Sequence, residues 1–212
     1  ELNRVELPKF QRALVWNKQK KMDLIETLHK DFPFGSLLVA PMKDSKSKLR
    51  LLDGQQRLST MREYEKHKVD YWKKLNHLDY RNDLKQINDI LDQFSGDKLS
   101  EKHFDVLLKK EEELGDWTDS YESLHIPVED RKKMRTIVNE TIAKIEGYIR
   151  LDDLRIPLIK FLGNDEDLPE IYENLNKGGT PLNKYEIYNA AWSNENLNIP
   201  SDFNLGDTIL NN

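Results

Sequence analysis

Cysteine is absent from this chain of 212 residues. Disulfide bonds, thiolate metal sites and a cysteine nucleophile are therefore excluded. Long hydrophobic runs are also missing, because no stretch approaches the roughly 20 apolar residues that a membrane-spanning helix needs. The amino terminus has neither the charged nor the apolar region of a signal peptide, so we expect a cytoplasmic protein without membrane attachment.

An excess of basic charge is missing as well. The chain carries 33 lysine and arginine residues against 38 aspartate and glutamate residues, which gives a net charge of −5. Domains that are held to DNA mainly by neutralising phosphates need the opposite balance. Both signs are mixed along the chain, as on solvated helix faces, so we expect DNA binding by this chain alone to be weak.

Two common catalytic patterns are not found in the sequence. No segment follows the rule G-x-x-x-x-G-K-[ST], which excludes a P-loop nucleotide site. The histidines, at positions 29, 67, 77, 103 and 125, show neither paired metal-ligand spacing nor a neighbouring nucleophile. Metal-histidine and nucleophile-histidine chemistry are therefore poor candidates for this chain.

Hydrophobic periodicity predicts the order of helices and strands. Extended patterns cover 5–10, 36–40, 49–52 and 154–161, and the second and third of these are expected to pair as a hairpin. Pro157 limits the last of them to an edge or bulged strand. Helical patterns cover 18–30, 82–94, 100–114, 128–150, 168–175 and a last segment that begins near Thr180.

These elements predict an α/β fold of the α+β kind, with a small mixed sheet and a large helical insertion. We expect residues 1–69 to form the core and 70–150 to form the helical insertion. Residues 151–193 are expected to return to the core as a strand and a helix–loop–helix. Residues 194–212 are expected to be a loop or the lead into a further domain.

The segment Asp53-Gly54-Gln55-Gln56-Arg57 lies where a strand pattern turns into a helical one. Glycine lets the backbone approach a ligand closely, and the start of a helix offers N–H groups and a positive dipole to an anion. Arg57 suits a bidentate phosphate contact, the two amides can orient water or a sugar, and Asp53 can hold a metal ion. The alternative is a capping box with Asp53 as N-cap and Gln56 reaching back to it.

Two other segments contain residues that suit a nucleotide. Gln11 and Arg12 stand near Trp16, and together they can grip a base and its phosphates, although a surface arginine that packs on Trp16 is the alternative. The second segment is a turn between two helical patterns that favours an anion, and it contains Asn176, Lys177, Gly178 and Thr180. Its alternative is an ordinary helix–loop–helix corner.

Four motifs follow one another along the chain. They are LPKFQRALVW at 7–16, DFPFGS at 31–36, LDGQQRLST at 52–60 and LNKGGTPL at 175–182. In this order they resemble the DGQQR-type branch of the ParB/sulfiredoxin-like superfamily. That branch forms the amino-terminal half of GmrSD-like type IV restriction enzymes and of related phage-defence proteins that sense modified DNA. Ser59 departs from the family pattern, in which threonine is usual, but it keeps the hydroxyl.

The resemblance implies a ParB-like core that binds and hydrolyses a nucleoside triphosphate, with GTP expected, in the presence of Mg²⁺. It also implies a nuclease domain or subunit elsewhere and modified DNA as a partner of the full-length protein, and it is compatible with an oligomer. The residues that it implicates in catalysis are Asp53, which also holds the metal, Gln56 and Arg57. Those that it implicates in nucleotide binding are Gln11, Arg12, Gly54, Gln55, Ser59, Thr60, Asn176, Lys177, Gly178 and Thr180.

Two other functions remain open from the sequence. One is a nucleotide-gated sensor or clamp of modified DNA that binds without hydrolysis. The other is a ParB-like nuclease domain that acts on nucleic acid directly. The acidic balance and the missing histidine pattern argue against the nuclease.

Overall fold

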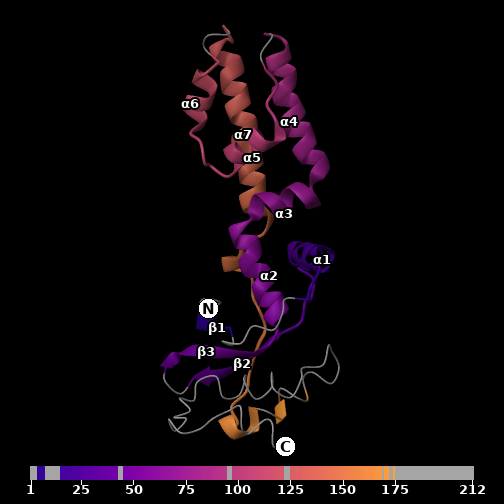
Figure 1. The fold of residues 1–212 in the computed structure, drawn as a ribbon, viewed down its shortest axis with the longest axis vertical. Coiled ribbons are helices and arrows are strands. Elements are labelled where there is room, and N and C mark those ends of the chain that lie inside the picture. Colours follow the sequence, from indigo (N-terminus) through magenta and orange to yellow (C-terminus); the bar gives the residue numbers. More distant parts are fainter. Residues whose placement is uncertain are drawn as a thin grey trace, which may run out of the picture. The chain divides into compact units, whose positions relative to one another are not determined.

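The structure is a computed structural model that describes residues 4–7, 15–42, 45–94, 97–121 and 125–168, together with 170, 171 and 174 (Figure 1). Its strands are β1 Val5–Glu6, β2 Leu37–Met42, β3 Ser45–Asp53 and β4 Leu158–Lys160. Its α-helices are α1 Lys18–His29, α2 Gln55–Lys66, α3 Lys68–Leu75, α4 His77–Asp92, α5 Glu101–Leu108, α6 Leu114–Asp119 and α7 Val128–Tyr148. Short 3-10 helices occupy Leu151–Asp153 and Asp165–Asp167. This combination confirms the predicted α/β class.

The strands form one mixed sheet in the order β1-β3-β2-β4. β1 runs parallel to β3, whereas β2 runs antiparallel to β3 with Val39 opposite Leu51, which confirms the predicted hairpin. β4 lies at the edge of the sheet, where the backbone N–H of Phe161 donates to the carbonyl of Val39 at 2.8 Å. The edge position agrees with the prediction from Pro157, because proline cannot donate to a neighbouring strand.

The chain divides into two compact units. Among the described residues, one unit holds the sheet residues 4–7, 38–42 and 45–53 and the chain from 159, and its apolar cluster is formed by Ala40, Leu52 and Leu168. The other unit holds 15–37 and 54–158, and thus the helices α1 to α7. The domain boundaries that the sequence predicts at 69/70 and 150/151 remain a prediction.

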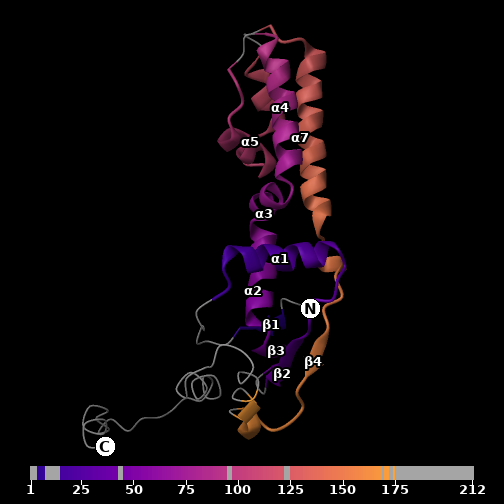
Figure 2. The same ribbon diagram turned by 90° about the vertical axis from the view of Figure 1, so that its right-hand side faces the viewer.

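Helix α1 begins at an effective N-cap, because Asn17 Oδ1 accepts a hydrogen bond from the backbone N–H of Lys20 at 2.9 Å. The helix packs across α2 (Figure 2), and the apolar cluster between them contains Leu24, Ile25, Leu28, Met61, Tyr64, Tyr71 and Ile149. Residues at this spacing share one face of a helix. The cluster therefore fixes the position of α2 against α1.

Helices α2, α3 and α4 follow one another with single-residue breaks. His67 separates α2 from α3 with φ −132° and ψ 39°, and Asn76 separates α3 from α4 with φ −122° and ψ 46°. The sequence does not predict α3, because neither glycine nor proline marks its ends. The predicted helix at 100–114 is also divided, because α5 ends at Leu108 and Lys110 adopts φ 57° before α6 begins.

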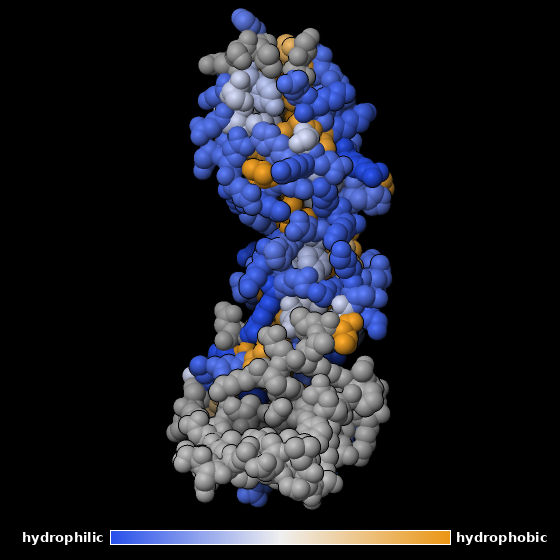
Figure 3. Space-filling view, in the orientation of Figure 1, coloured by the Kyte–Doolittle hydropathy of each residue, from blue (hydrophilic) through white to orange (hydrophobic). Residues whose placement is uncertain are grey.

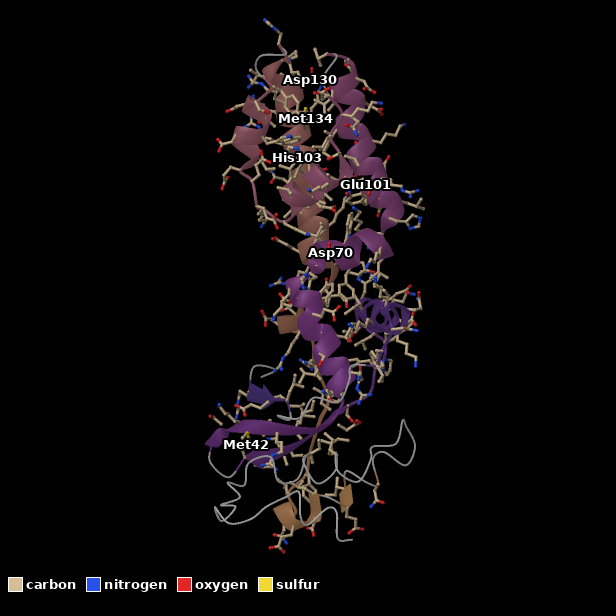
Figure 4. All side chains as sticks on the ribbon, viewed as in Figure 1. Met42, Asp70, Glu101, His103, Asp130 and Met134 are labelled. Carbon is tan, nitrogen blue, oxygen red and sulfur yellow. The ribbon has the colours of Figure 1, made fainter. Side chains whose placement is uncertain are left out.

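Helices α4 to α7 form a bundle in which α4 and α7 lie side by side (Figure 1 and Figure 2). Phe104, Trp117 and Met134 are buried in its core, and Met134 is labelled in Figure 4. The bundle surface seen in Figure 3 is mostly hydrophilic, with small separate hydrophobic patches. One carboxylate is buried inside: Asp83 accepts hydrogen bonds from Thr141 at 2.9 Å and from Lys144 at 3.0 Å.

Candidate functional site

The segment from Asp53 to Arg57 joins a strand to a helix, as the sequence predicts. Asp53 is the last residue of β3, Gly54 is the N-cap of α2, and α2 begins at Gln55. Gly54 has a φ of 97°, which residues with a Cβ atom rarely adopt. A Cβ atom at this position would collide with the side chain of Leu37. The backbone conformation and the close neighbour both require glycine here.

The guanidinium of Arg57 lies over the start of its own helix. Nη2 donates a hydrogen bond to the carbonyl of Ser36 at 2.8 Å. A Cβ atom on Gly54 would lie 3.3 Å from Nη2, and one on Gly35 would lie 3.6 Å from Nη1. The guanidinium is therefore half-buried between two glycines, and it connects the first turn of α2 to the segment that leads into β2.

The side chain of Gln56 points to a different partner from the one that a capping box requires. Its Oε1 accepts a hydrogen bond from the backbone N–H of Trp16 at 3.3 Å. The N-cap of α2 is Gly54, not Asp53. The capping-box alternative is therefore wrong, because the glycine extends the strand-to-helix turn by one residue. Gln56 instead holds the chain that enters α1 against the first turn of α2.

The two hydroxyl residues of the segment differ in exposure. Ser59 is half-buried, whereas Thr60 is buried with 1% of its surface exposed. The hydroxyl of Thr60 donates to the carbonyl of Gln56 at 2.8 Å, within α2. Thr60 thus supports the helix turn that carries Gln56.

The helix starts in this region carry no acidic residue. The first turns of α1 and α2 both lack aspartate and glutamate, and that of α1 contains Lys18, Lys20 and Lys21. The first N–H groups of a helix have no acceptor within the helix, which gives the helix start a positive partial charge. The start of α2, with the Arg57 guanidinium beside it, therefore favours an anion.

Further along α2, one carboxylate links this helix to α1 and α3. Glu63 accepts hydrogen bonds from Lys21 at 2.5 Å and from the Tyr71 hydroxyl at 3.1 Å. Burial alone would raise the pKa of Glu63, but the two hydrogen bonds and the charge of Lys21 lower it, and the net pKa is below its usual value. The contacts favour the charged form of Glu63 and hold the three helices together.

Six of the predicted site residues lie outside the described part of the chain. They are Gln11, Arg12, Asn176, Lys177, Gly178 and Thr180. The structure therefore brings together Gly54, Gln55, Gln56 and Arg57 at the start of α2, directly after Asp53. The predicted contacts from the two other segments remain predictions.

The model of the family described as GmrSD restriction endonuclease, N-terminal domain, matches residues 1–193. The chain belongs to this family. Its resemblance to the amino-terminal half of GmrSD-like enzymes is thereby confirmed, and the chain is part of a restriction protein. No match was found among curated proteins or among solved structures.

In this GmrSD-family chain, the site includes contacts that the sequence did not predict. Gly35 and Ser36 flank and bind the guanidinium of Arg57, and the backbone of Trp16 binds Gln56. A signal was available, because these residues belong to two of the four ordered motifs. Within the described residues, no helix has the length and apolar character that crossing a membrane requires.

Proposed function

We propose that this chain binds a nucleoside triphosphate, with GTP expected, at the first turn of α2 and hydrolyses it with Mg²⁺. Hydrolysis would serve a restriction protein that senses modified DNA and whose nuclease lies outside this chain. One observation carries the proposal: the Arg57 guanidinium lies against Gly54 at the start of a helix whose first turn has no acidic residue.

The phosphates would occupy the start of α2. Gly54, which has no side chain, leaves room for Leu37 and for the Arg57 guanidinium beside the helix start. The helix start contributes N–H donors and positive partial charge, and a guanidinium contributes charge-assisted hydrogen bonds. Arg57 would stabilise the charge that develops on the transferred phosphoryl group, while Ser36 keeps its guanidinium in place.

Asp53 is the residue that would hold Mg²⁺. Its side chain is exposed and directly precedes the N-cap of α2. Among the described residues, no group of three or more histidine, aspartate or glutamate side chains could hold a metal ion by itself. A single carboxylate nevertheless fits Mg²⁺, because this ion usually keeps water and takes its other ligands from substrate phosphates.

The amides of Gln55 and Gln56 would orient the attacking water. Gln55 is the first residue of α2, and Gln56 is fixed by its hydrogen bond with the Trp16 backbone. Positioning of water by an amide and stabilisation of charge by an arginine are the main requirements of phosphoryl transfer to water. Gln11, Arg12 and the turn from Asn176 to Thr180 would contact the nucleotide from the other side.

Release of inorganic phosphate from GTP in the presence of Mg²⁺ tests the hydrolytic part of the proposal. We expect turnover by the parent chain and a loss of at least about tenfold in Gln55→Ala, because a positioned water is lost. Leu78→Ala, an exposed substitution on α4, is the control and should leave turnover unchanged. Tight GTP binding without phosphate release would contradict hydrolysis and favour the non-hydrolysing sensor.

A further inference from the structure

A pocket of about 350 Å³ lies between the end of α1 and the segment that follows α7. Its lining includes Asp31, Phe32 and Phe34 on one side and Asp153, Leu154 and Arg155 on the other. The volume is at the lower end of the range for small-molecule sites. The pocket belongs entirely to the unit that also contains Arg57.

The pocket lining includes the apolar side chains of Leu28, Phe32, Phe34 and Leu154. Leu28 is buried, and Phe34 and Leu154 pack against the same apolar cluster. The ring of Phe32, in contrast, is 59% exposed. The accessible lining of the pocket is mostly polar, and the exposed phenyl ring of Phe32 provides a face on which a planar ring can stack.

The backbone that carries Phe32 is fixed by the end of α1. The N–H of Asp31 donates to the carbonyl of Leu28 at 3.1 Å, and the N–H of Phe32 donates to the carbonyl of Thr27 at 3.0 Å. Asp31 adopts a φ of 54°, so this pair of bonds forms a Schellman-type helix end. Asp31 and Phe32 are therefore held in place before any ligand arrives.

The polar groups of the pocket include a carboxylate on one wall and a guanidinium on the other. Asp153 is already engaged, because one of its oxygens lies 3.1 Å from Nε of Arg150. Asp31 makes no ion pair with another described residue, and its side chain is exposed. Arg155 is also exposed. The pocket thus offers an acceptor, a donor and a stacking face to one planar ligand.

We propose that this pocket binds the base of the nucleoside triphosphate and that the base is guanine. This inference rests on the proposed function, because it places the base of the same ligand whose phosphates lie at α2. Guanine presents N1–H and N2–H₂ donors, which match the Asp31 carboxylate, and O6 and N7 acceptors, which match the Arg155 guanidinium. Adenine would place its N1 acceptor against the carboxylate.

The pocket and the phosphate site are connected by a short piece of chain. Phe34 lines the pocket, and the next two residues, Gly35 and Ser36, contact the Arg57 guanidinium. The Cα atoms of Phe32 and Gly35 are at most about 11 Å apart, because three residues span no more. The ribose and three phosphates of the ligand would bridge the distance between the pocket and the Arg57 guanidinium. The DFPFGS motif would therefore serve both the base and the phosphates.

The test compares ligands that share the phosphates but differ in the base. Calorimetry on the full 212-residue chain with Mg²⁺ measures the affinities of GTP, ATP and inorganic tripolyphosphate. In Phe32→Ala we expect GTP affinity to fall by about 5- to 150-fold, which is the range for loss of base stacking, and tripolyphosphate affinity to stay unchanged. Leu78→Ala, which removes another exposed apolar side chain, is the matched control.

A second variant tests the choice of base. Asp31→Asn keeps a residue type that tolerates positive φ, so the helix end should stay intact. We expect the preference for GTP over ATP to fall by about tenfold or more, because a charge-assisted acceptor is lost. If both variants bind GTP, ATP and tripolyphosphate like the parent, the pocket is not the base site although the phosphate site stands. If the parent binds neither GTP nor tripolyphosphate, the proposed function fails and this inference fails with it.

Discussion

Arg57 on α2 donates a hydrogen bond from Nη2 to the backbone carbonyl of Ser36 at 2.8 Å. This contact joins two segments that are 21 residues apart in the sequence, and it places the guanidinium between Gly35 and Gly54. The arginine that is proposed to bind phosphate therefore also has a structural role. Substitutions at this position must be judged by stability as well as by ligand affinity.

Arg57→Ala is expected to lower both the free energy of unfolding and the affinity for the nucleotide. Loss of a hydrogen bond from a charged donor costs about 1.5–3 kcal/mol of unfolding free energy, and loss of a charge-assisted phosphate contact costs more than about tenfold in nucleotide affinity. Urea unfolding and GTP titration measure the two effects separately. Arg81→Ala, which removes an exposed arginine from α4, should change neither quantity. Equal urea midpoints for Arg57→Ala and the parent would contradict the structural role.

Gly54→Ala is expected to destabilise the chain by about 1–3 kcal/mol, because alanine is strained at φ 97° and its methyl group would collide with Leu37. Gly147→Ala on α7 is the matched control. A Cβ atom there meets nothing within 4 Å, so the same substitution should be neutral or stabilising by up to about 1 kcal/mol. Thermal melting of both variants decides the matter, and a stabilised Gly54→Ala would contradict the described turn.

Asp83→Ala is expected to cost about 1.5–3 kcal/mol of unfolding free energy, because the bundle loses the buried acceptor of Thr141 and Lys144. Asp89→Ala on the same helix provides the comparison. Asp89 is exposed, and its oxygen lies 3.8 Å from Nζ of Lys85, so its loss should change stability by no more than about 0.5 kcal/mol. Similar urea midpoints for the two variants would mean that the Asp83 contacts contribute little.

The Glu63 contacts predict a pH dependence of stability. The pKa of Glu63 is lower in the folded chain than its ordinary value of 4.5, mainly because the hydrogen bonds from Lys21 and Tyr71 outweigh its burial. The stability that the Glu63 contacts contribute is therefore fully present above pH 4.5. It is lost as the pH falls through the lowered pKa of Glu63. Glu63→Gln should lose less stability than the parent over this acidic range. Parallel urea midpoints for the two proteins across the range would disprove this contribution.

The sequence predicts those elements for which the apolar periodicity and the residues at the element ends indicate the same structure. The hairpin, the edge strand at Pro157 and the helix after Gly54 follow from apolar periodicity and from the special residues that bound them. The break at His67 does not, because an ordinary residue takes a non-helical conformation there while the flanking helices pack on other elements. Local pattern cannot anticipate a conformation that packing imposes.

In the candidate site, too, the local structure could be predicted from the sequence, whereas the tertiary contacts could not. The change from a strand pattern to a helical one predicts that Asp53 to Arg57 lie at a helix start, and the structure agrees. The partners of its side chains, Ser36 for Arg57 and Trp16 for Gln56, depend on contacts between segments 21 and 40 residues apart. From spacing alone, a capping box between Asp53 and Gln56 is the simplest alternative. In the structure, Gln56 instead accepts a hydrogen bond from the backbone of Trp16.

The most direct test of the central claim is a calorimetric titration of the parent chain, in the presence of Mg²⁺, with GTP, GDP, GMP and guanosine at low and high salt. If the start of α2 and Arg57 bind phosphates, affinity must fall stepwise as phosphates are removed, and salt must weaken GTP binding. Guanosine that binds as tightly as GTP, or no binding of any of the four, would contradict the account.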